Sequence, residues 1–166
     1  MDNNIKKLLI GIVSAGAIIA VLMWLGNAPE TGNRAQLASG SQILSVAETT
    51  YDFGRISMAK GSVIHTFAVR NTSTEPARVR KLYTSCMCTE ALLDLGEKRV
   101  GPFGMPGHGF IPSIDETLAP GQEATVEVTF DPAAHGSAGV GAVNRVVTLE
   151  HEQGTLQLRI TAFVTP

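Results

Sequence analysis

Two patterns of apolar residues divide this chain. Residues 8–25 form one apolar run of eighteen residues without a charged side chain. From about residue 43 onward, apolar and polar residues alternate instead, with the period of two that a β-strand with one buried face requires. The two patterns predict a single apolar helix near the N-terminus, followed by an all-β domain over residues 43–166.

The apolar run has the length of a membrane span. Eighteen helical residues rise about 27 Å, close to the ~30 Å hydrocarbon core of a bilayer. Two lysines precede the run, and the first cation after it is Arg34, so the N-terminus is expected in the cytoplasm. A cleaved signal peptide is the competing interpretation, but its apolar core is usually shorter. We therefore expect an uncleaved signal-anchor over residues 1–26.

This anchor predicts a location and a first kind of partner. The protein would cross the bacterial cytoplasmic membrane once, with its C-terminal domain in the periplasm or outside the cell. Gly11 and Ala15, like Gly16 and Ala20, have the spacing that lets two membrane helices pack closely, which would allow a weak homodimer through the helix, although glycine and alanine are common in such spans. Residues 27–42 are small, polar and without periodicity, as in a flexible linker.

Alternation and turn residues predict the strands of the remaining domain. Strands are expected over Ile43–Ala47, Val63–Val69, Ala77–Thr84, Val126–Phe130, Val143–Glu150 and Leu156–Val164. Glycine, proline and asparagine separate them, as turns require. Glu90–Leu95 favours one or two helical turns. About seven short strands predict an immunoglobulin-like seven-strand sandwich, with an open barrel as the alternative.

Composition excludes several classes of function. The chain has 166 residues, 44% of them apolar, and a net charge of −2. It lacks the basic stripe of nucleic-acid-binding proteins, so we expect no nucleic-acid partner. Its two cysteines are too few for a disulfide scaffold or a four-thiolate zinc site. No nucleophile elbow, P-loop or dinucleotide fingerprint is present, and we expect no enzyme.

Several short strings resemble a known family in their order. They are Tyr51-Asp52-Phe53-Gly54, Phe67-Ala68-Val69-Arg70-Asn71-Thr72, Ser85-Cys86-Met87-Cys88-Thr89, Pro120-Gly121 and Val126-Glu127-Val128-Thr129-Phe130-Asp131-Pro132. Over about residues 45–164 the chain is similar to the bacterial domain of unknown function 1573, a group of Hydin-like immunoglobulin-like domains. The resemblance implies an exported or membrane-tethered seven-strand sandwich and no particular reaction. Met87 departs from the family's usual glycine, and the loop from Cys88 to Pro120 is longer than usual.

The cysteine motif is the one constellation that suggests chemistry. Cys86 and Cys88 follow a predicted strand, and residues i and i+2 on extended backbone face the same side. Met105 and His108 lie in a glycine-rich loop that could cover the thiols. Thiolate and thioether ligands select Cu(I), and imidazole is compatible with it. These four residues are the candidate copper ligands, whereas Met87 is less favoured because it would point away.

Two other interpretations of the cysteines compete with a copper site. In an oxidising compartment the pair could close a disulfide. On extended backbone their Cα atoms lie about 6.5 Å apart, so that bond would be strained and easily reduced. Alternatively, both cysteines are small structural residues at a strand end.

The histidines outside this loop have ordinary structural interpretations. His65 lies on an apolar stripe and is expected in the core or at an edge, His135 shapes a turn, and His151 ends a solvated hairpin. The sequence therefore predicts a membrane-tethered, exported binding module whose partner is an unidentified envelope protein, docked through an exposed sheet edge. A copper(I)-binding or copper-delivery protein is the alternative, and a thiol–disulfide redox protein is the second alternative.

Overall fold

The computed structural model describes residues 43–107 and 112–166. The predicted anchor over 8–25, the linker over 27–42 and the candidate ligand His108 lie outside these residues. Within the described part, no helix is both long enough and apolar enough to cross a membrane.

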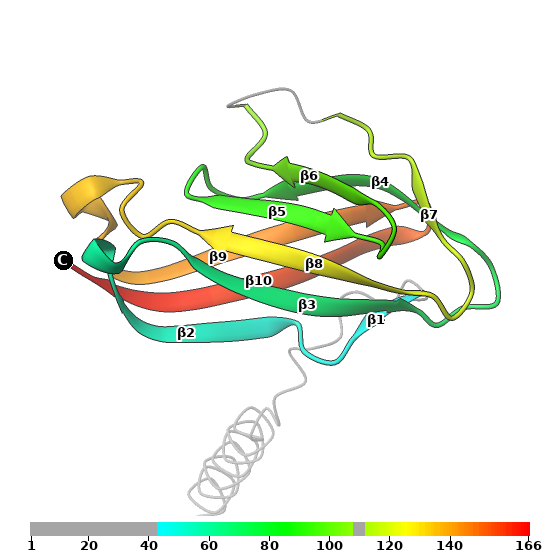
Figure 1. Ribbon diagram of the computed structural model, residues 1–166, viewed down its shortest axis with the longest axis horizontal. Coiled ribbons are helices and arrows are strands. Elements are labelled where there is room, and N and C mark those ends of the chain that lie inside the picture. Colours follow the sequence, from blue (N-terminus) through cyan, green and yellow to red (C-terminus); the bar gives the residue numbers. More distant parts are fainter. Residues whose placement is uncertain (1–42, 108–111) are drawn as a thin grey trace, which may run out of the picture. The chain divides into compact units, whose positions relative to one another are not determined.

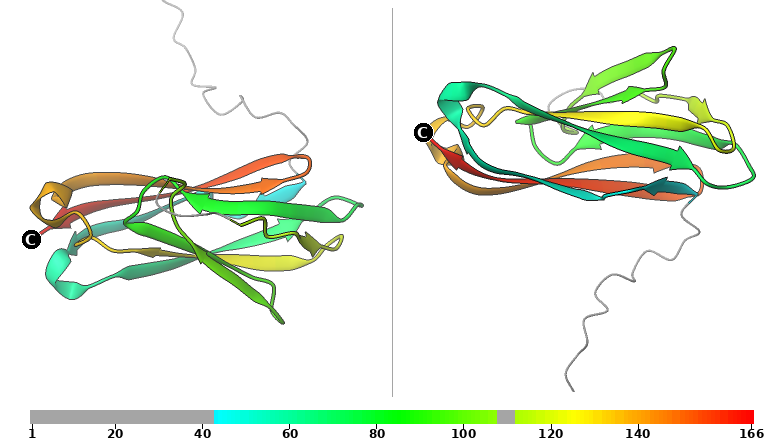
Figure 2. Two further views of the ribbon diagram at one scale, coloured as in Figure 1. Left: turned by 90° about the horizontal axis from the view of Figure 1, so that it is seen from above. Right: turned by 60° about the horizontal axis from the view of Figure 1, so that its bottom comes forward.

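The described chain folds into two five-stranded sheets stacked as a β-sandwich (Figures 1 and 2). One sheet has the order β1 (Leu44–Val46), β3 (Val63–Asn71), β8 (Glu123–Phe130), β5 (Thr89–Asp94) and β6 (Arg99–Phe103). The other has the order β2 (Thr50–Ser57), β10 (Gly154–Thr165), β9 (Gly141–His151), β4 (Ala77–Thr84) and β7 (Glu116–Leu118). Two short 3₁₀ helices, η1 (Met58–Lys60) and η2 (Gly136–Gly139), lie in the connections. The predicted all-β sandwich is confirmed.

Alternating side chains build the core between the sheets. In β10 the buried positions are every second residue, namely Leu156, Leu158, Ile160, Ala162 and Val164. Full burial of a large aliphatic or aromatic side chain contributes about 1.5–3 kcal/mol, and such residues on β3, β8 and β9 face the same interior. Neighbouring strands are antiparallel except β2 and β10, which run parallel.

The strand count is ten in the described residues, not seven. The six strand ranges expected from alternation are all found, one of them with the same bounds. The helical turn predicted over Glu90–Leu95 is wrong: Ala91 and Leu93 are buried in strand β5, which pairs with β8. Edge strand β6 contains Gly101-Pro102, a sequence that interior strands rarely tolerate. His151 is also not solvated, because it is only 7% exposed.

Two connections that cross between the sheets position the cysteines. The first links the end of β4 to the start of β5 and contains Cys86 and Cys88. The second links β8 to β9 and contains His135. The backbone N–H of Asp131 donates a 2.9 Å hydrogen bond to the carbonyl oxygen of Cys88, so the two connections are joined at one end of the sandwich.

Candidate functional site

The cysteines lie in a tight turn, not on extended backbone. The N–H of Thr89 donates to the carbonyl oxygen of Cys86 over 3.1 Å, which closes a four-residue turn. The hydroxyl of Thr84, which is 1% exposed, lies 3.0 Å from the Cys86 carbonyl oxygen and 2.8 Å from that of Thr89. The premise of an extended Cys-Met-Cys segment is therefore wrong, and the turn is what brings the two thiols together.

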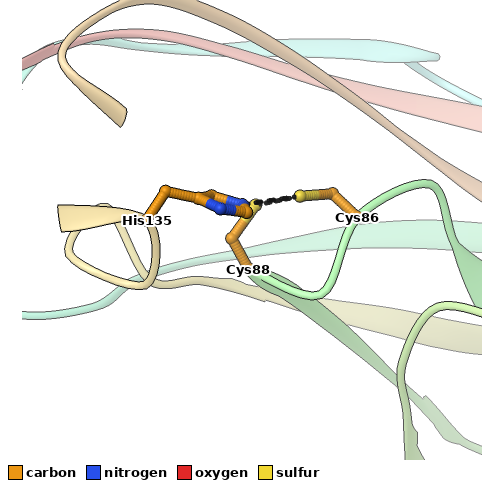
Figure 3. A group of neighbouring side chains, drawn as sticks. All are labelled: Cys86, Cys88 and His135. Carbon is orange, nitrogen blue, oxygen red and sulfur yellow. Dashed lines mark hydrogen bonds between the residues drawn. The ribbon is translucent and has the colours of Figure 1, made fainter. Parts of the chain in front are cut away.

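The two sulfur atoms are in direct contact. Both cysteines are free thiols, and Cys88 Sγ donates to Cys86 Sγ over 2.7 Å (Figure 3). This distance exceeds the ~2.05 Å of a disulfide bond. Cys86 is half-buried, whereas Cys88 is only 3% exposed. The pair thus has one accessible and one covered sulfur.

A histidine and an arginine complete the surroundings of the thiols. Figure 3 shows the imidazole of His135 reaching toward the cysteines from the β8–β9 connection. Its Nε2 lies 3.1 Å from Cys86 Sγ. From β9, Nε of Arg145 donates to Cys88 Sγ, also over 3.1 Å. Each sulfur therefore has its own nitrogen neighbour, from a different part of the sandwich.

These contacts separate the acidities of the two thiols. Partial burial raises the pKa of Cys86, but its hydrogen bonds with Cys88 and His135 and the charge of Arg145 outweigh it and lower the pKa to about 7. Burial raises the pKa of Cys88, and its hydrogen bond to Cys86 raises it further, against the opposing effect of Arg145. A low-pKa, accessible thiol beside a buried one is the pattern of reactive cysteine pairs.

An open pocket of about 390 Å³ gives access to Cys86. Its walls come from the residue before Cys86, from His135 and η2, and from the first residues of β9. Most of the residues of η2, of β9 and between them are small or apolar there: Ala138, Gly139, Val140, Ala142 and Val143. The accessible sulfur thus opens onto a surface on which a molecule larger than water could lie.

The other candidate ligands have different positions. Met105 is half-buried in the segment after β6, where the preceding Gly104 accepts a hydrogen bond from the N–H of Thr84. Met105 is not among the residues that line the pocket beside Cys86. Met87 is 52% exposed at the tip of the turn. His108 lies outside the described residues.

Sequence reasoning missed Arg145 and the role of His135. The prediction that His135 only shapes a turn overlooks its 3.1 Å contact with Cys86 Sγ. The two residues are 49 positions apart, so no local spacing connects them. The available signal was the turn after Val126–Phe130, since a sandwich connection there can meet the connection that follows Ala77–Thr84.

The sequence of this domain matches a family described as "Protein of unknown function (DUF1573)" over residues 44–99. Over this segment the chain is similar to the DUF1573 family. This finding confirms the resemblance drawn from the sequence motifs. The DUF1573 match includes the turn with Cys86 and Cys88 but ends before His135 and Arg145. No curated protein matches the chain.

Three solved structures are similar to this chain. A protein of unknown function from Porphyromonas gingivalis W83 is 14% identical with a TM-score of 0.54, covering 82% of this chain and 60% of that one. The secreted serine protease VesC from Vibrio cholerae is 14% identical with a TM-score of 0.48, and the match covers 76% of this chain and 25% of that one. The PapD-like domain 7 of human CEP192 is 12% identical with a TM-score of 0.44, and the match covers 83% of this chain and 96% of that one. The chain thus spans 60% of the Porphyromonas gingivalis protein and a quarter of VesC. The likeness to the Porphyromonas gingivalis protein supports the sandwich fold.

Proposed function

We propose that this β-sandwich is a thiol–disulfide exchange module that acts through Cys86 and Cys88. The observation that carries this proposal is the direct contact of the two sulfurs, 2.7 Å apart, with only one of them open to a pocket. Of the three interpretations drawn from the sequence, this is the one that the described geometry supports best.

The exchange has two balanced steps. The Cys86 thiolate attacks one sulfur of a partner's disulfide; the partner's S–S bond breaks, a mixed disulfide forms, and one partner thiolate leaves. Cys88 then loses its proton to solvent and attacks Cys86 Sγ, which releases the second partner thiolate and closes the Cys86–Cys88 disulfide. Two electrons pass from the cysteine pair to the partner's disulfide. A dithiol reductant restores the pair by the reverse steps.

The neighbouring side chains suit these steps. When His135 carries its proton on Nδ1, its Nε2 can accept the proton of Cys86 over 3.1 Å. Arg145 places a permanent positive charge against Cys88 Sγ, where negative charge develops in the second step. The proposal therefore assigns activation of the attacking thiol to His135 and stabilisation of the resolving thiolate to Arg145.

The remaining sequence predictions concern where the exchange would take place and with what kind of partner. We infer an exported domain, held to the cytoplasmic membrane by a helix over 8–25 and the linker over 27–42, that binds an envelope protein. The disulfide form can persist in such a compartment, because it is more oxidising than the cytoplasm, and the dithiol form is restored by the reductant. The binding role and the exchange role are compatible, since exchange requires the partner to dock.

Binding of a soft metal ion such as Cu(I) is the second candidate. Ligand atoms of Cys86, Cys88 and His135 all lie within 4.8 Å of one another, and two sulfurs with one imidazole suit a soft ion. However, sulfurs 2.7 Å apart would subtend only about 70° at an ion bound at ~2.3 Å, well below a tetrahedral angle. The thiols would have to separate before both could bind, so the geometry favours exchange.

A disulfide probe tests the proposal on the full-length protein in detergent. The wild type should react with 5,5′-dithiobis(2-nitrobenzoate), release two equivalents of thionitrobenzoate and lose two hydrogen atoms by mass. Cys88→Ser should stop at a stable adduct on Cys86, and Cys86→Ser should react far more slowly. Equal reactivity of both cysteines without an intramolecular disulfide would contradict exchange.

A Cu(I) titration against a competing chelator tests the second candidate. One tightly bound ion, lost in Cys86→Ser and in His135→Ala, would favour metal binding if the probe reaction also fails to close a disulfide. Equal and weak binding by wild type and variants would exclude the copper site.

A further inference from the structure

Among the strands that the structure describes, β9 has an edge without a partner that begins beside the cysteines. On one side, β9 pairs with β10 along its whole length, from Gly141 to His151. On the other side, β4 pairs only as far as Thr84, opposite Val147. Ser85 adds one more contact, because its N–H donates to the carbonyl oxygen of Val146 over 2.8 Å. Within residues 43–107 and 112–166, no strand pairs with this side of Gly141–Arg145.

The backbone groups on this free edge follow from the strand's alternation. The N–H of Val146 donates to Ser85 Oγ, and its carbonyl accepts from Ser85, so both groups of Val146 point toward β4. Because successive residues of an antiparallel strand point their backbone groups to opposite sides, those of Asn144 and Ala142 point the same way as those of Val146. The Asn144 carbonyl accepts from Nη1 of Arg145. Ala142 offers its N–H and C=O to the space beyond the end of β4.

The pocket that opens onto Cys86 lies along this edge. Ala142, Val143 and Arg145 of β9 line it together with Cys86. Val140, just before β9, is 45% exposed and lines it as well. An extended chain with small side chains could lie there with its backbone against β9. Since Cys86 follows the last residue that pairs with β9 on this side, such a chain would meet the sulfur end-on.

We propose that an extended, disulfide-bearing segment of a partner protein adds to the edge of β9 at Gly141–Asn144, in line with β4, and thereby delivers its sulfur to Cys86. This inference rests on the exchange function proposed above and names its substrate: a protein disulfide in an exposed, extended segment. Hydrogen bonds to the β9 backbone hold the segment irrespective of its sequence, while the small apolar pocket selects its side chains.

Two peptide probes test this docking on the full-length protein in detergent. Each is an alternating Ala/Thr heptapeptide whose central cysteine is disulfide-linked to thionitrobenzoate, and one of the two has N-methylated amides flanking the cysteine. The wild type should react about tenfold faster with the unmethylated peptide, the effect of one or two net hydrogen bonds. Equal rates for the two peptides would overturn the docking proposal, and this test needs only the wild-type protein.

Ala142→Pro provides the matched test on the protein. Proline removes an N–H that faces the free edge and not β10, so the β-ladder within the sandwich is kept. We expect this variant to lose the preference for the unmethylated peptide, while Ala142→Ser, which keeps the N–H, retains it. A preference unchanged in Ala142→Pro would overturn the proposal.

The small probe separates failure of docking from failure of the exchange function. For each variant, the rate with the peptides is divided by its own rate with 5,5′-dithiobis(2-nitrobenzoate), because that molecule needs no backbone partner. If the wild type closes no disulfide with this probe, the exchange function itself fails, and the docking proposal fails with it. If the wild type closes the disulfide but does not distinguish the two peptides, only the docking proposal fails.

Discussion

Arg145 donates a hydrogen bond from Nε to the sulfur of the buried Cys88, 3.1 Å away. Its side chain extends from β9, the same strand whose edge borders the Cys86 pocket. Burial lowers the pKa of Arg145, but its interactions with the two thiols outweigh this effect and raise it. The guanidinium therefore stays charged beside a sulfur that must become anionic for exchange to finish.

Replacement of Arg145 should slow the second step of exchange. Arg145→Met keeps most of the side-chain length but removes the charge and the hydrogen bond to Cys88. A hydrogen bond to a charged group is worth about 1.5–3 kcal/mol, so the mixed disulfide on Cys86 should persist at least about tenfold longer. Stopped-flow absorbance of the second thionitrobenzoate equivalent measures this lifetime. Arg70→Met, an exposed position on β3, is the control, and an equal effect there would refute the assignment.

The reactivity of Cys86 should rise through neutral pH. Its pKa is lowered to about 7 from an ordinary value of 9.0. Below pH 7 the sulfur is a protonated, unreactive thiol, and above pH 7 it is a thiolate. Alkylation by iodoacetamide, followed at Cys86 by mass spectrometry, should therefore have its midpoint near pH 7. A midpoint near 9 in the wild type would show that the surrounding groups do not activate this cysteine.

The same titration should report the contribution of His135. Loss of its hydrogen bond to Cys86 in His135→Ala removes one of the interactions that lower the pKa, so the alkylation midpoint should move upward. His135→Gln keeps a neutral hydrogen-bonding group at this position and should move it less. An unchanged midpoint in His135→Ala would leave the imidazole without a role in activation.

The hydroxyl of Thr84 should stabilise the folded protein and also hold the cysteine turn in the shape that disulfide closure requires. Thr84→Val is nearly isosteric but leaves the buried carbonyl of Thr89 without its 2.8 Å partner. An unsatisfied buried polar group costs about 1–3 kcal/mol, which urea unfolding would detect. Disulfide closure should slow as well, whereas Thr84→Ser should preserve both properties. Closure at the wild-type rate in a destabilised Thr84→Val would contradict the coupling.

Core packing gives an independent check of the fold. Leu158→Ala, at a fully buried position of β10, should lower the free energy of unfolding by about 2–5 kcal/mol. Ile64→Ala, at a position that is 59% exposed, should change it by no more than about 0.5 kcal/mol. Urea denaturation of the two variants should thus separate them clearly, and similar midpoints would conflict with the described burial.

Alternation predicted the strands whose sequences keep a clear period of two and missed those whose sequences do not. Ala77–Thr84 and the buried stripe of β10 follow the period of two closely, so their sequences suffice to locate them. Strand β6 contains Gly101-Pro102, and β7 has only three residues, so neither has a readable pattern. Strand β5 contains Ala91, Leu92 and Leu93 in a row, which fits a helix as well as a strand until its partner β8 is known.

The candidate site was predicted only as far as local spacing reaches. The two cysteines are neighbours in sequence, and their joint role follows from that. His135 and Arg145 join them through contacts between connections and strands 49 and 57 residues away. Such contacts depend on how the two sheets are connected, which a single sequence does not reveal. The turn that joins the sulfurs was missed for a simpler reason: no glycine or proline marks it.

The parallel pair of β2 and β10 has a mechanical consequence. β2 lies near the start of the described chain and β10 at its end, and they pair from Thr50 opposite Arg159 to Ser57 opposite Thr165. Because the strands run in the same direction, a pull on the two ends of the sandwich draws them past each other lengthwise. The hydrogen bonds on both sides of the register shift between Thr161 and Phe163 are then loaded in shear, and not opened one after another. This parallel pair should therefore resist a pull along the strands more strongly than a pair that opens from one end.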